Sequence, residues 1–113
     1  MSDCIFCKII AGQLPTEFVT ESENFIVIKD IQPKAPIHFL IIPKKHIASL
    51  NELKESDQNL VGQMLCQAKV LALEHGLDKR GYKIIINSGQ EAGQIVPHLH
   101  IHFLGGTKLA GLV

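Results

Sequence analysis

The chain lacks several features that mark whole classes of protein. It has 113 residues, and its 11 Lys and Arg side chains are balanced by 11 Asp and Glu side chains, so the formal net charge is zero. A nucleic-acid-binding surface needs clustered excess positive charge, and no such cluster is visible here. No apolar run approaches the roughly 18 residues that a membrane span requires. We therefore expect neither nucleic acid nor a membrane among its partners.

Cysteine is also scarce. There are three, and an odd number argues against a disulfide scaffold. The residues Met1–Asp3 lack the basic start and the apolar stretch of a signal peptide. Hydrophobic residues make up 46% of the chain, which is normal for a packed protein and too high for a disordered one. We expect a soluble cytoplasmic protein with one domain over residues 1–113.

The hydrophobic pattern predicts two helices and five strands. A short helix is expected over residues 3–11 and a long one over 57–75, where apolar side chains recur at three- and four-residue steps. Strands are expected over residues 17–20, 24–29, 37–42, 82–87 and 97–104. Most of the connections are too short for parallel crossovers. The sequence therefore predicts an α+β fold with a mainly antiparallel five-stranded sheet.

Histidine is unusually abundant. The chain has six, and His98, His100 and His102 alternate with apolar residues. In a strand these three side chains share one face, about 6.6–6.8 Å apart, and the apolar residues between them face the long helix. Histidine has no special preference for strands, so the alternation favours a functional role over a structural one. Metal ligation, acid–base catalysis and nucleophilic attack are all compatible with it.

A loop with two glycines, Ser88–Gln94, precedes this predicted strand. Its backbone N–H groups can form a small anion-binding nest close to the histidines. The glycines alone fit an ordinary loop equally well. Beside three histidines, phosphate binding becomes the more attractive interpretation.

Taken together, these residues resemble the histidine triad (HIT) superfamily, whose signature is His-x-His-x-His followed by apolar residues. The matching segments are 4–10, 30–39, 42–47, Asn87, 93–94 and 98–106. The resemblance therefore covers nearly the whole chain, and it is closest to the Hint branch, the nucleoside phosphoramidate hydrolases.

The resemblance implies an enzyme that cleaves nucleoside 5′-phosphoramidates, of adenosine or guanosine, at the P–N bond. His100 is implied as the nucleophile that attacks the α-phosphorus and forms a nucleotidyl-histidine, which water then hydrolyses. His102 would donate to a phosphate oxygen, and His38 would position His100. Asn87 and Gln94 would supply neutral donors to phosphate and bridging oxygens.

The resemblance also implies a nucleoside pocket. Asp30 would accept hydrogen bonds from both ribose hydroxyls, because a carboxylate offers two oxygens to a cis-diol. The implied nucleotide-binding set is Phe6, Ile9, Leu14, Ile28, Asp30, Ile31, Asn87, Gly93, Gln94, His100 and His102. Its five apolar members would sandwich the base, although the residues alone favour plain core. Ile95 departs from the pattern, since many Hint proteins have a small polar residue that touches phosphate there.

Cys4 and Cys7 form a Cys-x-x-Cys pair. A redox pair usually follows a strand, and no strand fits into three preceding residues. The pair can instead be half of a tetrahedral zinc site, or two reduced cysteines without metal. The resemblance implies His46 and His98 as the two further ligands of a structural zinc ion. The third cysteine, Cys66 on the predicted long helix, is expected to be buried.

Other functions stay open. The chain can be a hydrolase of dinucleoside polyphosphates, or a non-catalytic purine-nucleotide sensor or scaffold. It can also be a zinc hydrolase with all three triad histidines as ligands, although Cys4, Cys7 and His46 would then have no explanation. The intact His100 argues against pure binding.

A homodimer is implied by the resemblance, because Hint proteins pair through the long helix and an adjacent strand, joining two sheets. The residues support this independently. The long helix is apolar over a wide arc, and the apolar strand 83–86 would be an aggregation-prone edge if it were left unpaired. A monomer in which this strand is interior is the alternative.

Overall fold

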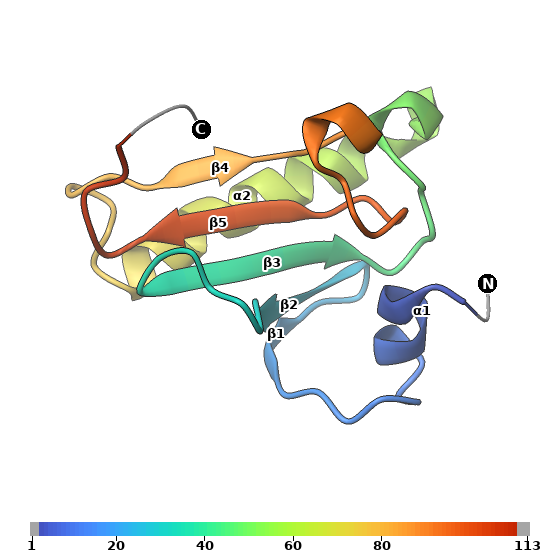
Figure 1. Cartoon of the computed structure of the whole chain (residues 1–113), viewed down its shortest axis with the longest axis horizontal. Coiled ribbons are helices and arrows are strands. Elements are labelled where there is room, and N and C mark those ends of the chain that lie inside the picture. The colour runs from blue at the N-terminus through green and yellow to red at the C-terminus, as the bar shows by residue number, and fades with distance from the viewer. Residues whose placement is uncertain (1–2, 111–113) are drawn as a thin grey trace.

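The computed structural model describes residues 3–110 and has an α+β fold (Figure 1). Its helices are α1 (Ile5–Ile10) and α2 (Gln58–Glu74), and its strands are β1 (Phe18–Glu21), β2 (Phe25–Lys29), β3 (Ile37–Pro43), β4 (Lys83–Ile85) and β5 (Ile101–Gly105). Short 3-10 turns lie at Leu50–Glu52, Glu55–Asp57 and Gln90–Ala92. Among these residues, no helix is both long and apolar enough to cross a membrane.

All five strands form one sheet in the order β1-β2-β3-β5-β4, and every neighbouring pair is antiparallel. β5 therefore lies between β3 and β4, although it comes last in the chain. In this register His38 lies opposite Leu104 and Leu40 lies opposite His102. Because paired residues point to the same side of a sheet, His38 and His102 project from one face.

Alternation along the strands separates two cores. On one face, Val27, Phe39, Ile41 and Phe103 pack with α2. On the opposite face, Ile26, Ile28, Leu40 and Ile42 pack with Cys4, Phe6 and Ile9 of the α1 segment. In Figure 1, α2 runs behind the sheet and α1 lies near the N-terminus, beside β2 and β3. The face that carries His38 and His102 is therefore the face on which α1 docks.

The end of α2 is fixed by a left-handed glycine. Gly76 has φ +70°, and the N–H groups of Gly76 and Leu77 donate to the carbonyls of Leu73 and Ala72. This is the hydrogen-bond pattern of a Schellman motif. The fully buried Leu77 then packs against Gly105 at the end of β5, where a β-carbon would lie 2.5 Å from a Leu77 methyl carbon. α2 is thereby clamped to the strand that carries His102.

The fold class is as the sequence predicts, but several boundaries differ. The predicted strand over residues 97–104 is wrong in its first half, because β5 begins at Ile101. Pro97 has no N–H to donate to a ladder, and the N–H of His98 donates back to the carbonyl of Val96 at 2.8 Å. His98 therefore lies in a bend and His100 in an irregular segment before the strand, and the three histidines do not share one continuous strand face.

Smaller corrections concern the ends of other elements. The short helix spans residues 5–10 instead of 3–11, and β4 spans 83–85 instead of 82–87.

Cys66 is exposed on α2 and not buried as expected. Only a narrow stripe of α2 faces the sheet, with Met64, Ala68, Leu71 and Ala72 buried, and Cys66 lies outside that stripe.

Candidate active site and metal site

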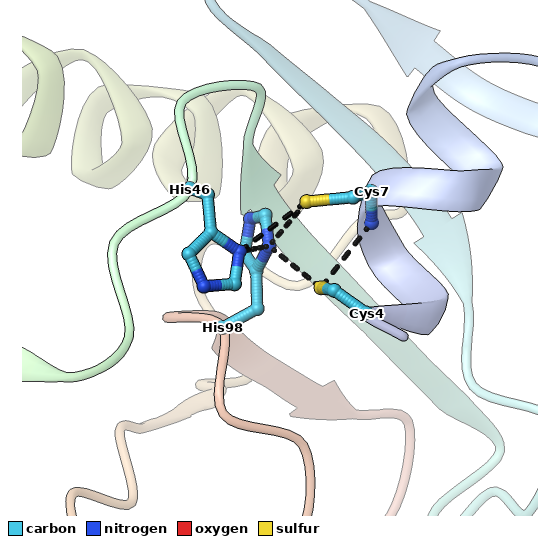
Figure 2. Close-up of side chains that lie close together, drawn as sticks. All are labelled: Cys4, Cys7, His46 and His98. Atoms are coloured by element: carbon cyan, nitrogen blue, oxygen red, sulfur yellow. Dashed lines mark hydrogen bonds between the residues drawn. The ribbon is translucent and has the colours of Figure 1, made fainter. Parts of the chain in front are cut away.

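Four potential metal ligands converge where α1 meets the sheet (Figure 2). The Sγ of Cys4 lies 3.3 Å from Nδ1 of His98, and the Sγ of Cys7 lies 3.3 Å from Nδ1 of His46. The two Nδ1 atoms are 3.1 Å apart. All four ligand atoms lie within 4.8 Å of one another, so the Cys-x-x-Cys pair and the two histidines form one cluster.

Local structure explains how each ligand is presented. Cys4 is the N-cap of α1, and its Sγ accepts a hydrogen bond from the N–H of Cys7 at 3.4 Å. The three-residue spacing places both thiols on one side of the helix. The Nε2 of His98 lies 2.8 Å from the carbonyl oxygen of Pro43. A carbonyl only accepts, so Nε2 carries the proton and the lone pair of Nδ1 faces the thiols.

The charge state of the cluster also favours a cation. Burial lowers the pKa of His98, which keeps its imidazole neutral, and a neutral imidazole is the form that binds metal. Burial, followed by the hydrogen bond and charge of Cys4, raises the pKa of the Cys7 thiol. Both effects favour the uncharged forms of these two side chains. A divalent cation would supply the opposite charge and stabilise the thiolates.

This donor set fits zinc. Two thiolates and two imidazoles are a common tetrahedral set, with bonds of about 2.3 Å to sulfur and about 2.0–2.1 Å to nitrogen. At tetrahedral angles those bonds place the ligand atoms roughly 3.3–3.8 Å apart. Four of the six pairs of ligand atoms are 3.1–3.6 Å apart, and all six are within 4.8 Å. Four protein ligands fill the coordination sphere, so the site is suited to a structural ion and not to a catalytic one.

His100 follows this cluster with a different hydrogen bond. Its Nδ1 lies 2.7 Å from the backbone oxygen of His98, so Nδ1 must carry the proton and Nε2 keeps its lone pair. The ring of Phe6 contacts His100 edge-on, with the centroids 5.1 Å apart. This is the state that a nucleophilic imidazole needs, with one nitrogen held as a donor and the other free to attack.

A second cluster, of Asp30, His38 and His102, lies on the same face of the sheet. The Nε2 of His38 is 3.0 Å from Nδ1 of His102 and 3.3 Å from an Oδ of Asp30. Burial lowers the pKa of His38, and burial together with the neighbouring His100 and His38 lowers the pKa of His102 to about 4. Both imidazoles are therefore neutral at pH 7.

The two clusters differ in the hydrogen bond made by the histidine ring nitrogen that does not face the other side chains of its cluster, here called the outer nitrogen. In His98 the outer nitrogen donates to a carbonyl, which is usual for a metal-binding imidazole. In His38 the outer nitrogen, Nδ1, accepts a hydrogen bond from the N–H of Lys34 at 3.0 Å. Its proton must then be on Nε2, and a protonated nitrogen cannot bind a metal. The second cluster is accordingly a chain of hydrogen bonds, and it does not present a metal site.

The three triad histidines thus lie in different surroundings. Within residues 3–110, His98 and His102 fall in separate clusters and His100 falls in neither. A zinc hydrolase that uses all three triad histidines as ligands needs them to converge on one point. The geometry argues against that alternative.

The loop before the triad is held by its own hydrogen bonds. The Nε2 of Gln94 donates to the carbonyls of Ala48 and Val96 at 2.7 and 3.1 Å, and its Oε1 accepts from the N–H of Gly89 at 2.8 Å. Both amide hydrogens of Gln94 are therefore committed, and the phosphate contact implied by the sequence would require one of these bonds to break. Gln94 instead ties the loop to the segment that follows His46.

The predicted anion nest is wrong for the central part of this loop. The N–H groups of Ala92, Gly93 and Gln94 donate to carbonyls of Gly89 and Gln90. They point within the loop, so they are not available to an anion. The contribution of Gly93 is conformational, since its φ of +91° suits glycine. Space does not require glycine, because a β-carbon there would lie at an ordinary contact distance of 4.0 Å from the amide nitrogen of Asn87.

The apolar residues assigned to the base pocket divide into two groups. Phe6, Ile9 and Ile28 are buried together in the core beneath α1. Leu14 is 37% exposed and Ile31 is 93% exposed, so neither belongs to that core. Ile95, the departure from the family pattern, is 91% exposed in the loop before the triad.

Comparisons with known proteins agree with this geometry. Residues 3–110 match the family described as "Scavenger mRNA decapping enzyme C-term binding". A HIT-like protein from Chlamydia muridarum is 46% identical over 108 residues, covering 96% of this chain and 85% of that protein. The crystal structure of a HIT family hydrolase from Legionella pneumophila is 44% identical, covers 96% of each chain and has a TM-score of 0.93.

The chain belongs to the histidine triad superfamily. The family resemblance that the sequence shows is thereby confirmed. A structure of a zinc-bound histidine triad family protein from Mycobacterium smegmatis is also similar, with 38% identity, a TM-score of 0.73 and coverage of 91% of this chain and 74% of that chain.

The family resemblance implies a backbone carbonyl as the partner of the His100 ring, but the sequence does not show which backbone groups of this HIT protein hold each histidine. The carbonyls of His98 and Pro43 and the N–H of Lys34 fix the protonation of His100, His98 and His38. Every residue type except proline carries both backbone groups, so no residue pattern reveals them. For Lys34, its place four residues before His38 was the only available signal.

Proposed function

We propose that this HIT protein hydrolyses purine nucleoside 5′-phosphoramidates at the P–N bond, through a nucleotidyl intermediate on His100. One observation carries the proposal: Nδ1 of His100 lies 2.7 Å from the carbonyl oxygen of His98 and donates its proton to it, which leaves the lone pair of Nε2 for nucleophilic attack. The similarity to a HIT family hydrolase supports hydrolysis as the reaction class.

In the first step the lone pair of Nε2 attacks the α-phosphorus and forms a P–N bond to His100. The electrons of the scissile P–N bond leave with the amine, which takes up a proton from solvent water. His100 then carries a positive charge, and its Nδ1–H bond to the carbonyl of His98 becomes charge-assisted and stronger. That hydrogen bond therefore stabilises the charge that develops on the nucleophile.

In the second step a water molecule attacks the same phosphorus and releases one proton to solvent, which balances the proton taken up by the amine. The bond between phosphorus and Nε2 breaks, the electron pair returns to Nε2, and a nucleoside monophosphate is released. His100 is neutral again with its proton still on Nδ1. No step requires its Nδ1 proton to leave the carbonyl of His98.

Asp30 is proposed as the ribose contact. One Oδ accepts a hydrogen bond from the N–H of Gln32 at 2.8 Å and the other lies near His38, and each oxygen retains a further lone pair for a hydroxyl group. Phe6, Ile9 and Ile28 supply the buried wall of the base pocket. We propose that the exposed Leu14 and Ile31 cover the base from its open side.

A structural zinc ion is part of the proposal. Cys4, Cys7, His46 and His98 would hold it. When bound, it would cross-link α1 to the segment after β3 and the segment before β5, and it would supply no chemistry to the reacting phosphorus. Phe6 lies between the two cysteines in sequence, so the metal site and the base pocket share α1.

We further propose a homodimer in the cytoplasm. β4 is an outer strand of the sheet, so the monomer with an interior strand is not what the fold provides. Leu65, Val70 and Leu73 of α2 are exposed large apolar side chains, which an isologous partner would cover. Light scattering tests this, since a mass near 12.5 kDa contradicts the dimer and about twice that supports it. Three free thiols suit a reducing compartment.

The decisive experiment offers the protein adenosine 5′-phosphoramidate and, separately, diadenosine tetraphosphate. We expect faster turnover of the phosphoramidate, and mass spectrometry of a rapidly quenched reaction to find an adenylyl group on His100. Preference for the dinucleoside polyphosphate would assign the chain to that alternative. Binding of AMP without turnover of either compound would make it a nucleotide sensor or scaffold.

A further inference from the structure

His38 is held by the main chain in one protonation state. Its Nδ1 lies 3.0 Å from the backbone nitrogen of Lys34, which carries a hydrogen and can only donate. The Nδ1 of a neutral His38 must therefore be the acceptor and Nε2 must carry the proton. Burial lowers the pKa of His38, so the neutral form prevails at pH 7.

This state determines the state of the next histidine. The Nε2–H of His38 lies 3.0 Å from Nδ1 of His102. Because His38 is the donor, Nδ1 of His102 must accept. The single proton of a neutral His102 is then on its Nε2, at the far side of the ring. A backbone N–H in the loop before β3 thus sets the protonation of a ring on β5.

Asp30 is a competing acceptor for the proton of His102. Its Oδ lies 3.3 Å from Nε2 of His38, the atom that contacts Nδ1 of His102 at 3.0 Å, and within 4.8 Å of a ring nitrogen of His102. If His38 were replaced by an apolar side chain, the carboxylate would be the nearest strong acceptor for a proton on Nδ1 of His102. The proton of His102 would then be drawn from Nε2 to Nδ1, toward Asp30 and away from the opposite side of the ring.

We propose that His38 is a positioning residue that fixes His102 as an Nε2–H donor, and that the backbone N–H of Lys34 fixes His38 in turn. The sequence resemblance instead implies that His38 positions His100. The role of His102 as a donor to a substrate phosphate rests on the proposed function. The protonation states of His38 and His102 do not.

The hydrogen bonds also exclude His38 as a proton shuttle. To pass its Nε2 proton to His102, His38 would have to take up another proton at Nδ1, where the N–H of Lys34 already donates. Lys34 cannot release that hydrogen. The series of hydrogen bonds therefore ends at the backbone N–H of Lys34. His38 orients the donor group of His102 and does not relay a proton.

The test reads the ring nitrogens directly. In the full-length protein labelled with 15N-histidine, long-range 1H–15N spectra show which ring nitrogen of each histidine is protonated. We expect Nε2–H for both His38 and His102 without any substrate. A proton on Nδ1 of either residue overturns the proposal, and this measurement needs no variant.

Two variants of His38 separate positioning from mere packing. In His38→Leu we expect the His102 proton to move to Nδ1, and the affinity for AMP to fall roughly tenfold or more, as for loss of one hydrogen bond to a charged group. In His38→Gln the side-chain amide can donate to Nδ1 of His102, so Nε2–H and most of the affinity should return. Unchanged Nε2–H in a folded His38→Leu protein overturns the proposal.

Lys34 offers a matched pair. Lys34→Ala keeps the backbone N–H and should leave unchanged which ring nitrogen carries the proton in neutral His38 and His102. Lys34→Pro removes the N–H and should allow His38 to populate its Nδ1–H form. The same protonation in both variants contradicts the role of Lys34. Because these spectra are recorded without substrate, a protein that fails to cleave phosphoramidates but shows these shifts refutes only the proposed function.

Discussion

The backbone oxygen of His98 accepts the Nδ1 proton of His100 at 2.7 Å, while the side chain of His98 faces Cys4 and Cys7. One residue thus belongs to the metal cluster through its ring and to the proposed nucleophile through its backbone. The ring of Phe6 contacts both histidines edge-on, with centroids 5.7 and 5.1 Å away. The two sites are therefore adjacent and share α1, but they use different atoms.

Replacing His100 with alanine should abolish turnover and spare nucleotide binding. The variant has no Nε2 to form the covalent intermediate, so we expect turnover to fall by roughly 1,000-fold or more. Steady-state kinetics and AMP titration measure the two effects. His75→Ala is the matched control, because His75 is exposed near the end of α2 and its ring contacts Phe39 instead of the site. Robust turnover by His100→Ala contradicts the assignment of the nucleophile.

Zinc should be present at one ion per chain in untagged protein. Cys4→Ser should lose the ion and lower the melting temperature by roughly 10 °C or more, because metal binding contributes folding free energy. The matched control is Cys66→Ser, since Cys66 is exposed on α2 and outside the cluster. Elemental analysis and calorimetry measure both. Full zinc content in Cys4→Ser argues that Cys4 is not a ligand.

Replacing Asp30 with asparagine should weaken the preference for ribose over deoxyribose. A hydroxyl group that donates to a carboxylate contributes roughly 1.5–3 kcal/mol, so the ratio of affinities for AMP and 2′-deoxy-AMP should fall roughly tenfold or more. The ratio cancels any general loss of affinity caused by the neighbouring His38. Asp78→Asn serves as a control at an exposed carboxylate after α2. An unchanged ratio would mean that Asp30 does not contact the ribose.

The free energy of unfolding should fall as the pH drops from about 6.5 to about 4. Burial, together with the neighbouring His100 and His38, lowers the pKa of His102 from 6.5 to about 4. Between these values the unfolded chain binds a proton that the folded chain does not, so acid favours unfolding. His102→Gln cannot titrate at this position. Denaturant titrations from pH 8 to pH 4 should therefore give a shallower pH dependence for His102→Gln, and parallel curves would refute the assignment.

The features that residue types determine could be predicted from the sequence. Strand alternation predicts that Phe25 and Val27 face one side and Ile26 and Ile28 the other, and these pairs enter different cores. The spacing of the cysteines, with the family resemblance, predicts the four-ligand cluster, although whether it holds metal stays a prediction. These features follow from side-chain chemistry and from the two-residue period of a strand.

The features that depend on hydrogen bonding could not be predicted. Alternation around His98–His102 mimics a strand, but Pro97 and the turn at Val96 delay the ladder to Ile101. The amide group of Gln94 can donate to phosphate or to carbonyls, and only the folded loop shows that it bonds Ala48 and Val96. In each case the sequence shows which groups exist, and the tertiary structure decides which partners they meet.

The cluster of Cys4, Cys7, His46 and His98 also limits when α1 can dock on the sheet during folding. Cys4 and His98 are 94 positions apart, so their contact cannot form during synthesis until nearly the whole domain has left the ribosome. α1 has six residues and is too short to be stable alone. We therefore expect its segment to have no fixed structure until the cluster forms. Closing so long a loop is slow relative to local helix formation. We therefore expect the wall that carries Phe6 and Ile9 to form late in folding, although its residues precede the other elements of the domain in sequence.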